Sequence, residues 1–166
     1  MLNKANSEYI LKVLNQIKDQ ICDIEEKILE QEIPVNNIFQ GKKAIIGNYD
    51  TFSSNELKKI LESFGMTVEI FKTGSEILEE IKNGYKCDVI FTNNVYQRGI
   101  QGPELLKELK QIQYFNSPVI IHTIDADRRT HFVDVLGFDE YIVKPIFASN
   151  SEKILEIKNI LEKLLK

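Results

Sequence analysis

The feature that most restricts the fold of this chain is an alternation of short apolar segments with longer amphipathic segments, which starts at Lys42. The short segments are rich in β-branched and aromatic residues and end at turn-forming residues, a pattern typical of buried strands in a parallel sheet. The sequence predicts five such strands, at residues 43–46, 67–71, 87–92, 119–123 and 140–143.

The segments between and after these strands carry apolar residues at helical spacing. The expected helices cover residues 53–64, 75–82, 102–112 and 129–136, and a last helix starts at Ser149 or Ser151. Ser53 or Ser54 is expected to cap the first helix. Because strands that are separated by helices must run parallel with right-handed crossovers, the helices cover both faces of the sheet. The predicted fold class is α/β, with a doubly wound five-stranded parallel sheet.

A long helix is predicted ahead of this domain, within residues 1–33, because residues 7–31 contain neither Gly nor Pro. Its apolar residues alternate in steps of four and three, which is the seam of a coiled coil. The seam residues are Ile10, Leu14, Ile17, Ile21, Ile24 and Ile28. We expect self-association through this seam, most simply as a homodimer, although Ile at both seam positions also favours higher oligomers. The alternative is a helix that packs on its own domain.

Pro34 is expected to end this helix, because proline restricts the residue before it and cannot continue the hydrogen-bond ladder. Residues 34–41 then form a short linker that contains Asn36, Asn37 and Gly41. The globular domain is expected to occupy residues 42–166.

Composition argues against several classes of function. The formal net charge is −4, so the chain has no overall attraction for the phosphate backbone of nucleic acids. No apolar run approaches the ~18 residues of a membrane span, and the N-terminus lacks the apolar segment of a signal peptide, which predicts a cytoplasmic protein. Cys22 and Cys87 form neither a disulfide framework nor a metal-binding pair, and we expect no cofactor. His122 is expected in the core with its polar atoms satisfied, and His131 on the surface.

Polar residues follow the third predicted strand, at the edge of the sheet where ligands gather in open α/β folds. They are Thr92, Asn93 and Asn94, a hydroxyl and two neutral amides, with no carboxylate, thiol or imidazole among them. The type of residue at this edge decides the functional interpretation, because a neutral amide carries no charge and supports different chemistry from a carboxylate, a thiol or an imidazole.

Several segments, taken in order, resemble the receiver domain of bacterial response regulators. EYIVKPI at residues 140–146 is similar to the family's fifth strand with its Lys-Pro end, and VIIHT at residues 119–123 to the fourth strand with its terminal Ser/Thr. GPELLKELK at residues 102–110 is similar to the family's Gly-led third helix, and residues 56–78 resemble its first helix, second strand and second helix. The resemblance covers residues 42–166 and implies a flavodoxin-like fold with strand order 2-1-3-4-5.

The resemblance also implies a site. Receiver domains accept a phosphoryl group on an Asp after the third strand, and an acidic pair after the first strand helps to hold Mg²⁺. In this sequence the acceptor position aligns with Asn93, and the acidic pair aligns with Asn48 and Tyr49, followed by Asp50. Four other positions do match the family: Thr123 and Tyr141 as its switch pair, Lys144 as its phosphate-binding lysine, and Pro145 as its cis-proline.

These departures predict a receiver-like domain without phosphoryl acceptance, a pseudo-receiver, and neither an enzyme nor a metal site. It would act by binding protein partners and by self-association. Lys144 is expected to bond to Asn93 or to strand-end carbonyls. One alternative is a phosphoacceptor that uses a displaced carboxylate, Asp50 or, less suitably, Asp88 at the far edge. Another is a small-anion sensor built from Lys144, Thr123 and Asn93.

Overall fold

The computed structural model describes residues 13, 14, 16–18, 20 and 37–165. The chain divides into two compact units, Met1–Val35 and Asn36–Lys166. In the first unit the six described residues are helical, and the seam residues Leu14 and Ile17 are exposed. The other predicted seam residues, Ile10, Ile21, Ile24 and Ile28, lie outside the described residues.

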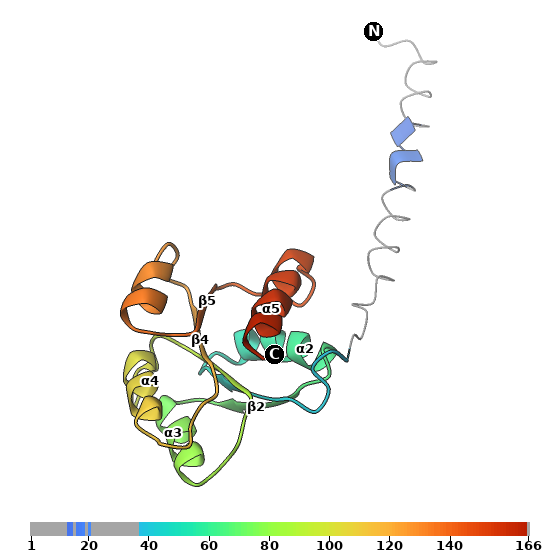
Figure 1. Ribbon diagram of the computed structural model, residues 1–166. Helices are drawn as coiled ribbons and strands as arrows, with labels where there is room; N and C mark the ends of the chain where they lie inside the picture. Colours follow the sequence, from blue (N-terminus) through green and yellow to red (C-terminus); the bar gives the residue numbers. More distant parts are fainter. Residues whose placement is uncertain (1–12, 15, 19, 21–36, 166) are drawn as a thin grey trace. The chain divides into compact units, whose positions relative to one another are not determined.

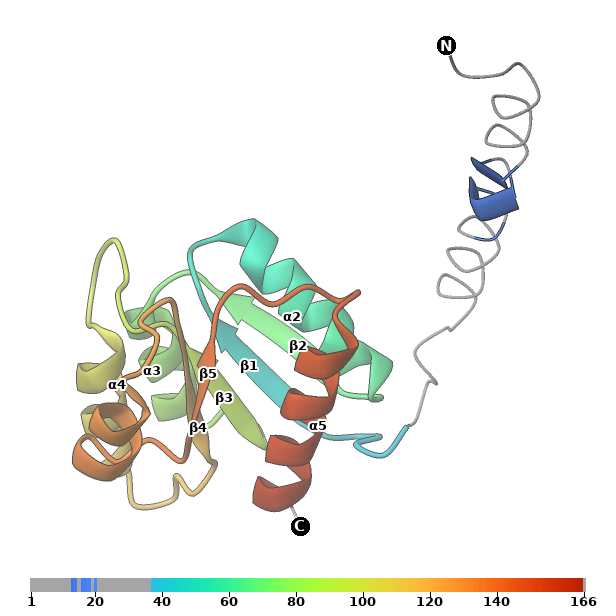
Figure 2. The same ribbon diagram turned by 90° about the horizontal axis from the view of Figure 1, so that it is seen from above.

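The second unit is built on five parallel strands in the order β2-β1-β3-β4-β5 (Figure 1, Figure 2). The strands are β1 (Lys43–Gly47), β2 (Thr67–Phe71), β3 (Val89–Thr92), β4 (Val119–Thr123) and β5 (Glu140–Val143). Successive residues of the central strands are buried on both sides, because helices cover both faces of the sheet. The predicted α/β fold with strand order 2-1-3-4-5 is confirmed.

Four α-helices of this unit pack in two layers. Helices α2 (Thr51–Ser63) and α5 (Ser151–Leu164) cover one face of the sheet, and α3 (Gly74–Lys82) and α4 (Gly102–Lys110) cover the other (Figure 2). Each layer has its own apolar core, and neighbouring residues of β1 alternate between them: Ala44 and Ile46 belong to the first core and Ile45 to the second.

The first helix does not begin with a serine cap, so the expectation for Ser53 or Ser54 is wrong. Asp50 is the N-cap of α2, and its Oδ1 accepts a hydrogen bond of 3.0 Å from the backbone N–H of Phe52. Ser54 is buried within the first turn, where its Oγ donates to the Asp50 carbonyl at 2.7 Å. Asp50 satisfies a backbone donor that the helix itself leaves unpaired, so the helix begins earlier than predicted.

The helix predicted at residues 129–136 is present over residues 129–135, but from His131 to Val135 it winds as a π-helix rather than as an α-helix. Its wide turn places the Phe132 ring against the Tyr141 ring, with 5.8 Å between the centroids, and edge-on to Phe138 at 6.1 Å. The aromatic packing accounts for the local geometry, since three buried rings meet there.

Strand β3 is shorter than predicted and starts at Val89 rather than at residue 87. The carboxylate of Asp88 accepts the backbone N–H of Lys43 at 2.8 Å, so a side chain takes a backbone donor just before the strand begins.

Candidate functional site at the carboxyl ends of the strands

Asn48 and Asn93 lie side by side where neighbouring strands β1 and β3 end. Both side chains are buried, with exposed fractions of 2% and 7%. The sheet holds both backbones in place: the Asn48 N–H donates to the Phe71 carbonyl and the Asn93 N–H to the Gly47 carbonyl, each at 2.9 Å. Residues that follow adjacent parallel strands are brought together at one edge of the sheet, as the sequence predicts for this pair.

A chain of side-chain hydrogen bonds connects Lys144, Asn93 and Asn48. The Lys144 ammonium donates to Asn93 Oδ1 at 2.6 Å, and Asn93 Nδ2 donates to Asn48 Oδ1 at 3.1 Å. Asn93 Nδ2 also donates to the Val95 carbonyl at 3.1 Å, and Asn48 Oδ1 also accepts the Asp50 backbone N–H at 3.1 Å. Both ends of the Asn93 amide are therefore engaged within the protein. We call these three side chains the amide network.

Lys144 is an unusual lysine because it donates to a neutral amide oxygen. It makes no ion pair with a carboxylate among residues 37–165. Burial lowers its pKa to about 8, and the negative charge of Asp50 opposes this shift only in part. The Lys144–Pro145 peptide bond is cis, and the Lys144 backbone N–H donates to the Thr123 carbonyl at 2.8 Å.

Asn48 carries a polar atom without a partner. Its Nδ2 is buried and makes no hydrogen bond with the described residues, whereas its Oδ1 accepts two. A buried donor without a partner lowers the stability of the folded state, and such groups are often found where a protein binds a water molecule, an ion or a ligand. Together with the Lys144 ammonium, this amide gives the strand ends an excess of hydrogen-bond donors.

Asp125 gathers the predicted switch residues into a second group. Its Oδ2 accepts from Thr123 Oγ1 at 3.2 Å and from Asn94 Nδ2 at 2.9 Å, and its backbone carbonyl accepts from the hydroxyl of Tyr141. The Tyr141 ring is turned inward and stacks on Phe132. Asp125 is not among the site residues that the sequence predicts. Its position two residues after the strand-end Thr123 is the signal that could have identified it.

The side chains of the two other predicted pocket residues do not join the hydrogen bonds of the amide network. The Tyr49 side chain is 41% exposed. The Asp50 carboxylate is occupied as the cap of α2, although its charge is felt by Lys144. The structure therefore brings together Asn48, Asn93 and Lys144, joins Thr123 to Tyr141 through Asp125, and leaves Tyr49 outside.

Tyr96 is a site residue that sequence reasoning missed. It is 3% exposed, and its hydroxyl forms a 2.8 Å hydrogen bond with Thr92 Oγ1, while burial raises its pKa to about 12. The hydroxyl lies directly over Gly47, where a Cβ atom would collide with it. A glycine at the end of an otherwise apolar strand is the signal for such a close approach.

The residues around the amide network do not suit a magnesium ion. Mg²⁺ prefers carboxylate oxygens, and the nearby carboxylates of Asp50 and Asp125 are already engaged with a helix end and with the Thr123 and Asn94 side chains. The described residues contain no group of three or more His, Cys, Asp or Glu side chains able to hold a metal ion.

His122 points into the core beside this edge and is 2% exposed. Burial, helped by the positive charges of Lys144 and Lys153, lowers its pKa to about 3, so the ring is neutral. Its Nε2 has no hydrogen-bond partner among the described residues, so the expectation of a fully satisfied core histidine is wrong. Within the described part of the chain, no helix is long and apolar enough to cross a membrane.

Comparison with known proteins gives the context of this site. The receiver domain of a Francisella response regulator is 26% identical, and the match covers 74% of this chain and 98% of that one with a TM-score of 0.60. The N-terminal domain of a response regulator/sensory box/GGDEF protein from Carboxydothermus hydrogenoformans is 25% identical, with 75% and 94% covered and a TM-score of 0.60. The response regulator TrrA from Thermotoga maritima, solved with Mg²⁺ and BeF, is 22% identical over 72% and 99% of the two chains, with a TM-score of 0.59, and shares the fold.

No curated protein sequence matches the chain significantly. The family model of the response regulator receiver domain matches residues 49–156, a span that contains β2 to β5 and most of the site. Because this match covers well over half of the sequence, the chain belongs to the family of response regulator receiver domains, which act in signal transduction.

Proposed function

We propose that this receiver domain signals without phosphorylation, by binding protein partners and by self-association. The observation that carries the proposal is the amide network. Asn93 stands where the family resemblance expects the phosphoacceptor Asp, and both ends of its amide are bonded to Lys144, Asn48 and Val95. An acyl phosphate requires a carboxylate nucleophile, which an amide does not provide.

The charges around Asn93 support the same conclusion. A site that accepts phosphate through Mg²⁺ collects several carboxylates, whose mutual repulsion the metal relieves. Here the neighbouring groups are the neutral amide of Asn48 and the ammonium of Lys144. With neutral amides in the network, there is no such repulsion for the metal to relieve.

The test is an amide NMR spectrum of the full chain, recorded with and without Mg²⁺ plus beryllofluoride, a mimic of aspartyl phosphate. We expect no change at Asn48, Asn93, Thr123 or Lys144. Asn93→Asp is the matched variant, because it returns a carboxylate to the same position. Localised shifts in the wild-type chain would overturn the proposal.

A second candidate, phosphorylation of a displaced carboxylate, is favoured by one observation: the charge of Asp50 acts on Lys144. Against it, the Asp50 carboxylate accepts a helix-cap hydrogen bond. Asp88 is a poorer acceptor, because it lies before β3 and pairs with Lys42 at 2.9 Å. An acid-labile mass gain after treatment with a small phosphodonor, abolished by Asp50→Asn, would establish this candidate in place of the first.

A third candidate is a small-anion sensor, favoured by the unpaired Nδ2 of Asn48 and the nearby ammonium of Lys144. Such a site would bind without a metal. Phosphate should then raise the melting temperature of the wild-type chain in the presence of a chelator, and Lys144→Gln should remove that effect. Equal stabilisation of both proteins would exclude this candidate.

Self-association is proposed to occur through the helix predicted within residues 1–33, which belongs to the first compact unit of the chain. The exposed apolar side chains of Leu14 and Ile17, at 55% and 45%, support this proposal. Removal of residues 1–35, which leaves the second unit and its core residue Phe39 whole, should lower the oligomeric state measured by light scattering. Ile17→Asp should do the same in the full chain, whereas Lys18→Asp is the control on a non-seam position. A truncated protein with the same number of subunits as the full chain would refute the role of this segment.

The protein partner is proposed to bind on the side of β5 and α5. Val135, in the π-helical turn, and Leu155, on α5, are large apolar side chains with exposed fractions of 69% and 55%. Val135→Asp and Leu155→Asp should each weaken partner binding. The domain should stay folded in both variants, because both side chains project from the surface.

A further inference from the structure

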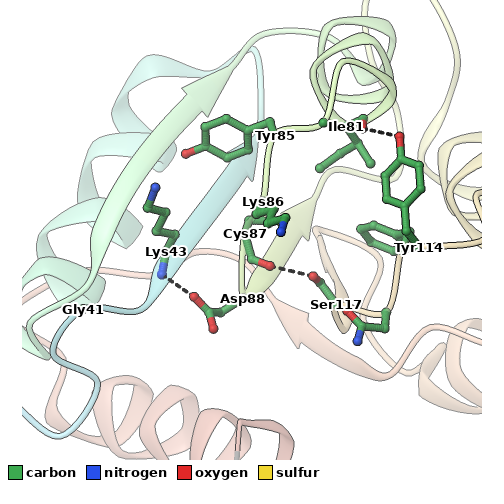
Figure 3. Close-up of a pocket in the computed structure, with 12 residues that line it drawn as sticks. Gly41, Lys43, Ile81, Tyr85, Lys86, Cys87, Asp88, Tyr114 and Ser117 are labelled. Carbon is green, nitrogen blue, oxygen red and sulfur yellow. Dashed lines mark hydrogen bonds between the residues drawn. The ribbon is translucent and has the colours of Figure 1, made fainter.

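The amide network lies at the carboxyl ends of the strands. A groove of about 770 Å³ lies at the opposite, amino ends, beside the starts of β1 and β3 (Figure 3). Three segments form it: the start of β1, the connection from α3 to β3 at residues 84–88, and the connection from α4 to β4 at residues 114–117. Its volume is within the range of sites that bind small molecules, ~300–1,000 Å³.

Two lysines give the groove a positive character. The ammonium groups of Lys43 and Lys86 make no ion pair among residues 37–165. The carboxylate of the lining, Asp88, is already engaged by the Lys42 ammonium at 2.9 Å and the Lys43 backbone N–H at 2.8 Å. Burial alone would raise the pKa of Asp88, but these hydrogen bonds hold it below the usual value, so the carboxylate stays paired with Lys42. The charges left for a ligand are therefore positive.

The aromatic walls are fixed in position by their hydroxyls. Tyr85 donates to Glu69 Oε1 at 2.6 Å. Tyr114 donates to the Ile81 carbonyl at 2.9 Å (Figure 3). The Lys43 ammonium lies 5.7 Å from the centre of the Tyr85 ring, which places a cation beside an aromatic surface. A wall that is ordered before binding reduces the entropy that a ligand must overcome.

The floor of the groove is also ordered. Cys87 is partly buried there, and the Ser117 hydroxyl donates to its backbone carbonyl at 2.6 Å, which links the two connections. Burial raises the pKa of the Cys87 thiol to about 11, so it contributes a neutral, weakly polar surface. The lining thus combines apolar surface, fixed rings and unpaired ammonium groups.

We propose that this groove binds a small organic anion with a flat ring. The ring would lie between the Tyr85 and Tyr114 walls (Figure 3), and the anionic group would be held by Lys43 and Lys86. Because the groove and the amide network are at opposite edges of the sheet, this site is separate from the proposed signalling function and does not depend on it.

The probe for the test is 1-naphthoate, with neutral 1-naphthamide as its isostere. Amide NMR of the full chain with 1-naphthoate should show saturable shifts at Lys43 and within residues 84–88 and 114–117. The naphthamide should bind about tenfold more weakly, since it lacks the charge that the lysines recognise.

Variants separate a built site from adventitious binding. The double variant Lys43→Gln with Lys86→Gln should weaken 1-naphthoate about tenfold, because two charge-assisted contacts are lost. The control, Lys58→Gln with Lys158→Gln, removes the same charge from α2 and α5 and should bind as the wild type does. Tyr85→Leu tests the ring wall separately. Failure to saturate at millimolar probe, shifts scattered over the surface, or equal losses in both double variants would each overturn the proposal.

Discussion

The buried ring of His122 should make this domain lose stability in mild acid. The ring is 2% exposed, and its pKa is lowered to about 3 by burial and by the charges of Lys144 and Lys153. In the unfolded chain the same ring has a pKa of about 6.5. Between these two values only the unfolded state binds the proton, so the free energy of unfolding falls as the pH falls through 6.5. Above that pH the ring is neutral in both states and has no effect.

The magnitude follows from the size of the shift. Each pH unit below 6.5 removes about 1.4 kcal/mol until the folded ring itself titrates, so lowering the pH from 7 to 5 costs about 2 kcal/mol. That is a large part of the ~5–15 kcal/mol stability of a typical domain. His122→Leu replaces the ring with an apolar side chain of similar size, so this contribution to the pH dependence should disappear.

Urea unfolding, followed by circular dichroism at several pH values from 7 to 5, measures the effect. The difference between the wild-type and His122→Leu free energies of unfolding should change by about 2 kcal/mol over this range. His131→Leu is the matched control, because it removes the other histidine and leaves His122 in place. This variant should keep the loss of unfolding free energy in acid. Two curves that run parallel from pH 7 to pH 5 would refute the reasoning, since they would mean that His122 titrates alike in both states.

Three further predictions concern the strand ends. Gly47→Ala should lower the free energy of unfolding by about 2 kcal/mol or more in urea unfolding, since its Cβ would collide with the Tyr96 hydroxyl. Tyr96→Phe in the same chain should recover part of this loss of stability. An Ala variant as stable as the wild type would contradict the close contact between Gly47 and Tyr96. Asp50→Ala should cost about 1 kcal/mol in the same assay, and Asp50→Ser, which keeps a capping oxygen, clearly less; equal costs would argue against the cap. The Lys144 amine should titrate near pH 8 when followed by NMR. Asn93→Asp should raise the pKa of Lys144, because it places a carboxylate at the atom to which the ammonium donates. An unchanged titration in this variant would mean that the ammonium does not face residue 93.

The sign of the Lys144 effect on stability differs from that of a lysine that gains a carboxylate partner. Its pKa is lowered on folding, so the unfolded chain holds the proton more tightly. Stability is therefore reduced as the pH falls from about 10.5 to about 8, and it should recover when the pH is raised through this range.

Much of the fold could be predicted from local pattern. The strand at residues 67–71 and the strand at residues 119–123 were predicted with the bounds that the structure has, because apolar runs between turn residues leave few alternatives. The sheet order came from the resemblance of segments such as residues 140–146 to receiver domains. The helix at residues 129–136 was predicted, but its π-helical winding at His131–Val135 was not, because helical spacing does not reveal that Phe132 stacks on Tyr141, a contact made across the tertiary structure.

The candidate site could be predicted only in part, for a similar reason. Strand ends place Asn48, Asn93 and Lys144 at one edge in any parallel sheet of this order, so their meeting follows from topology. The role of Asp125, which accepts hydrogen bonds from Thr123 and Asn94, depends on the path of a loop. Loop paths are set by side-chain packing, and sequence periodicity carries no information about them.

The amide network has a consequence for how this edge behaves in a changing cell. An edge bridged by an ion is only as firm as the supply of that ion, and chelation or competition can loosen it. Here one ammonium and two amides link the ends of β5, β3 and β1 through bonds of 2.6 and 3.1 Å, and every component is part of the polypeptide. The geometry of these strand ends is thus set by the sequence alone, and it should not change with the concentration of metal ions in the cell.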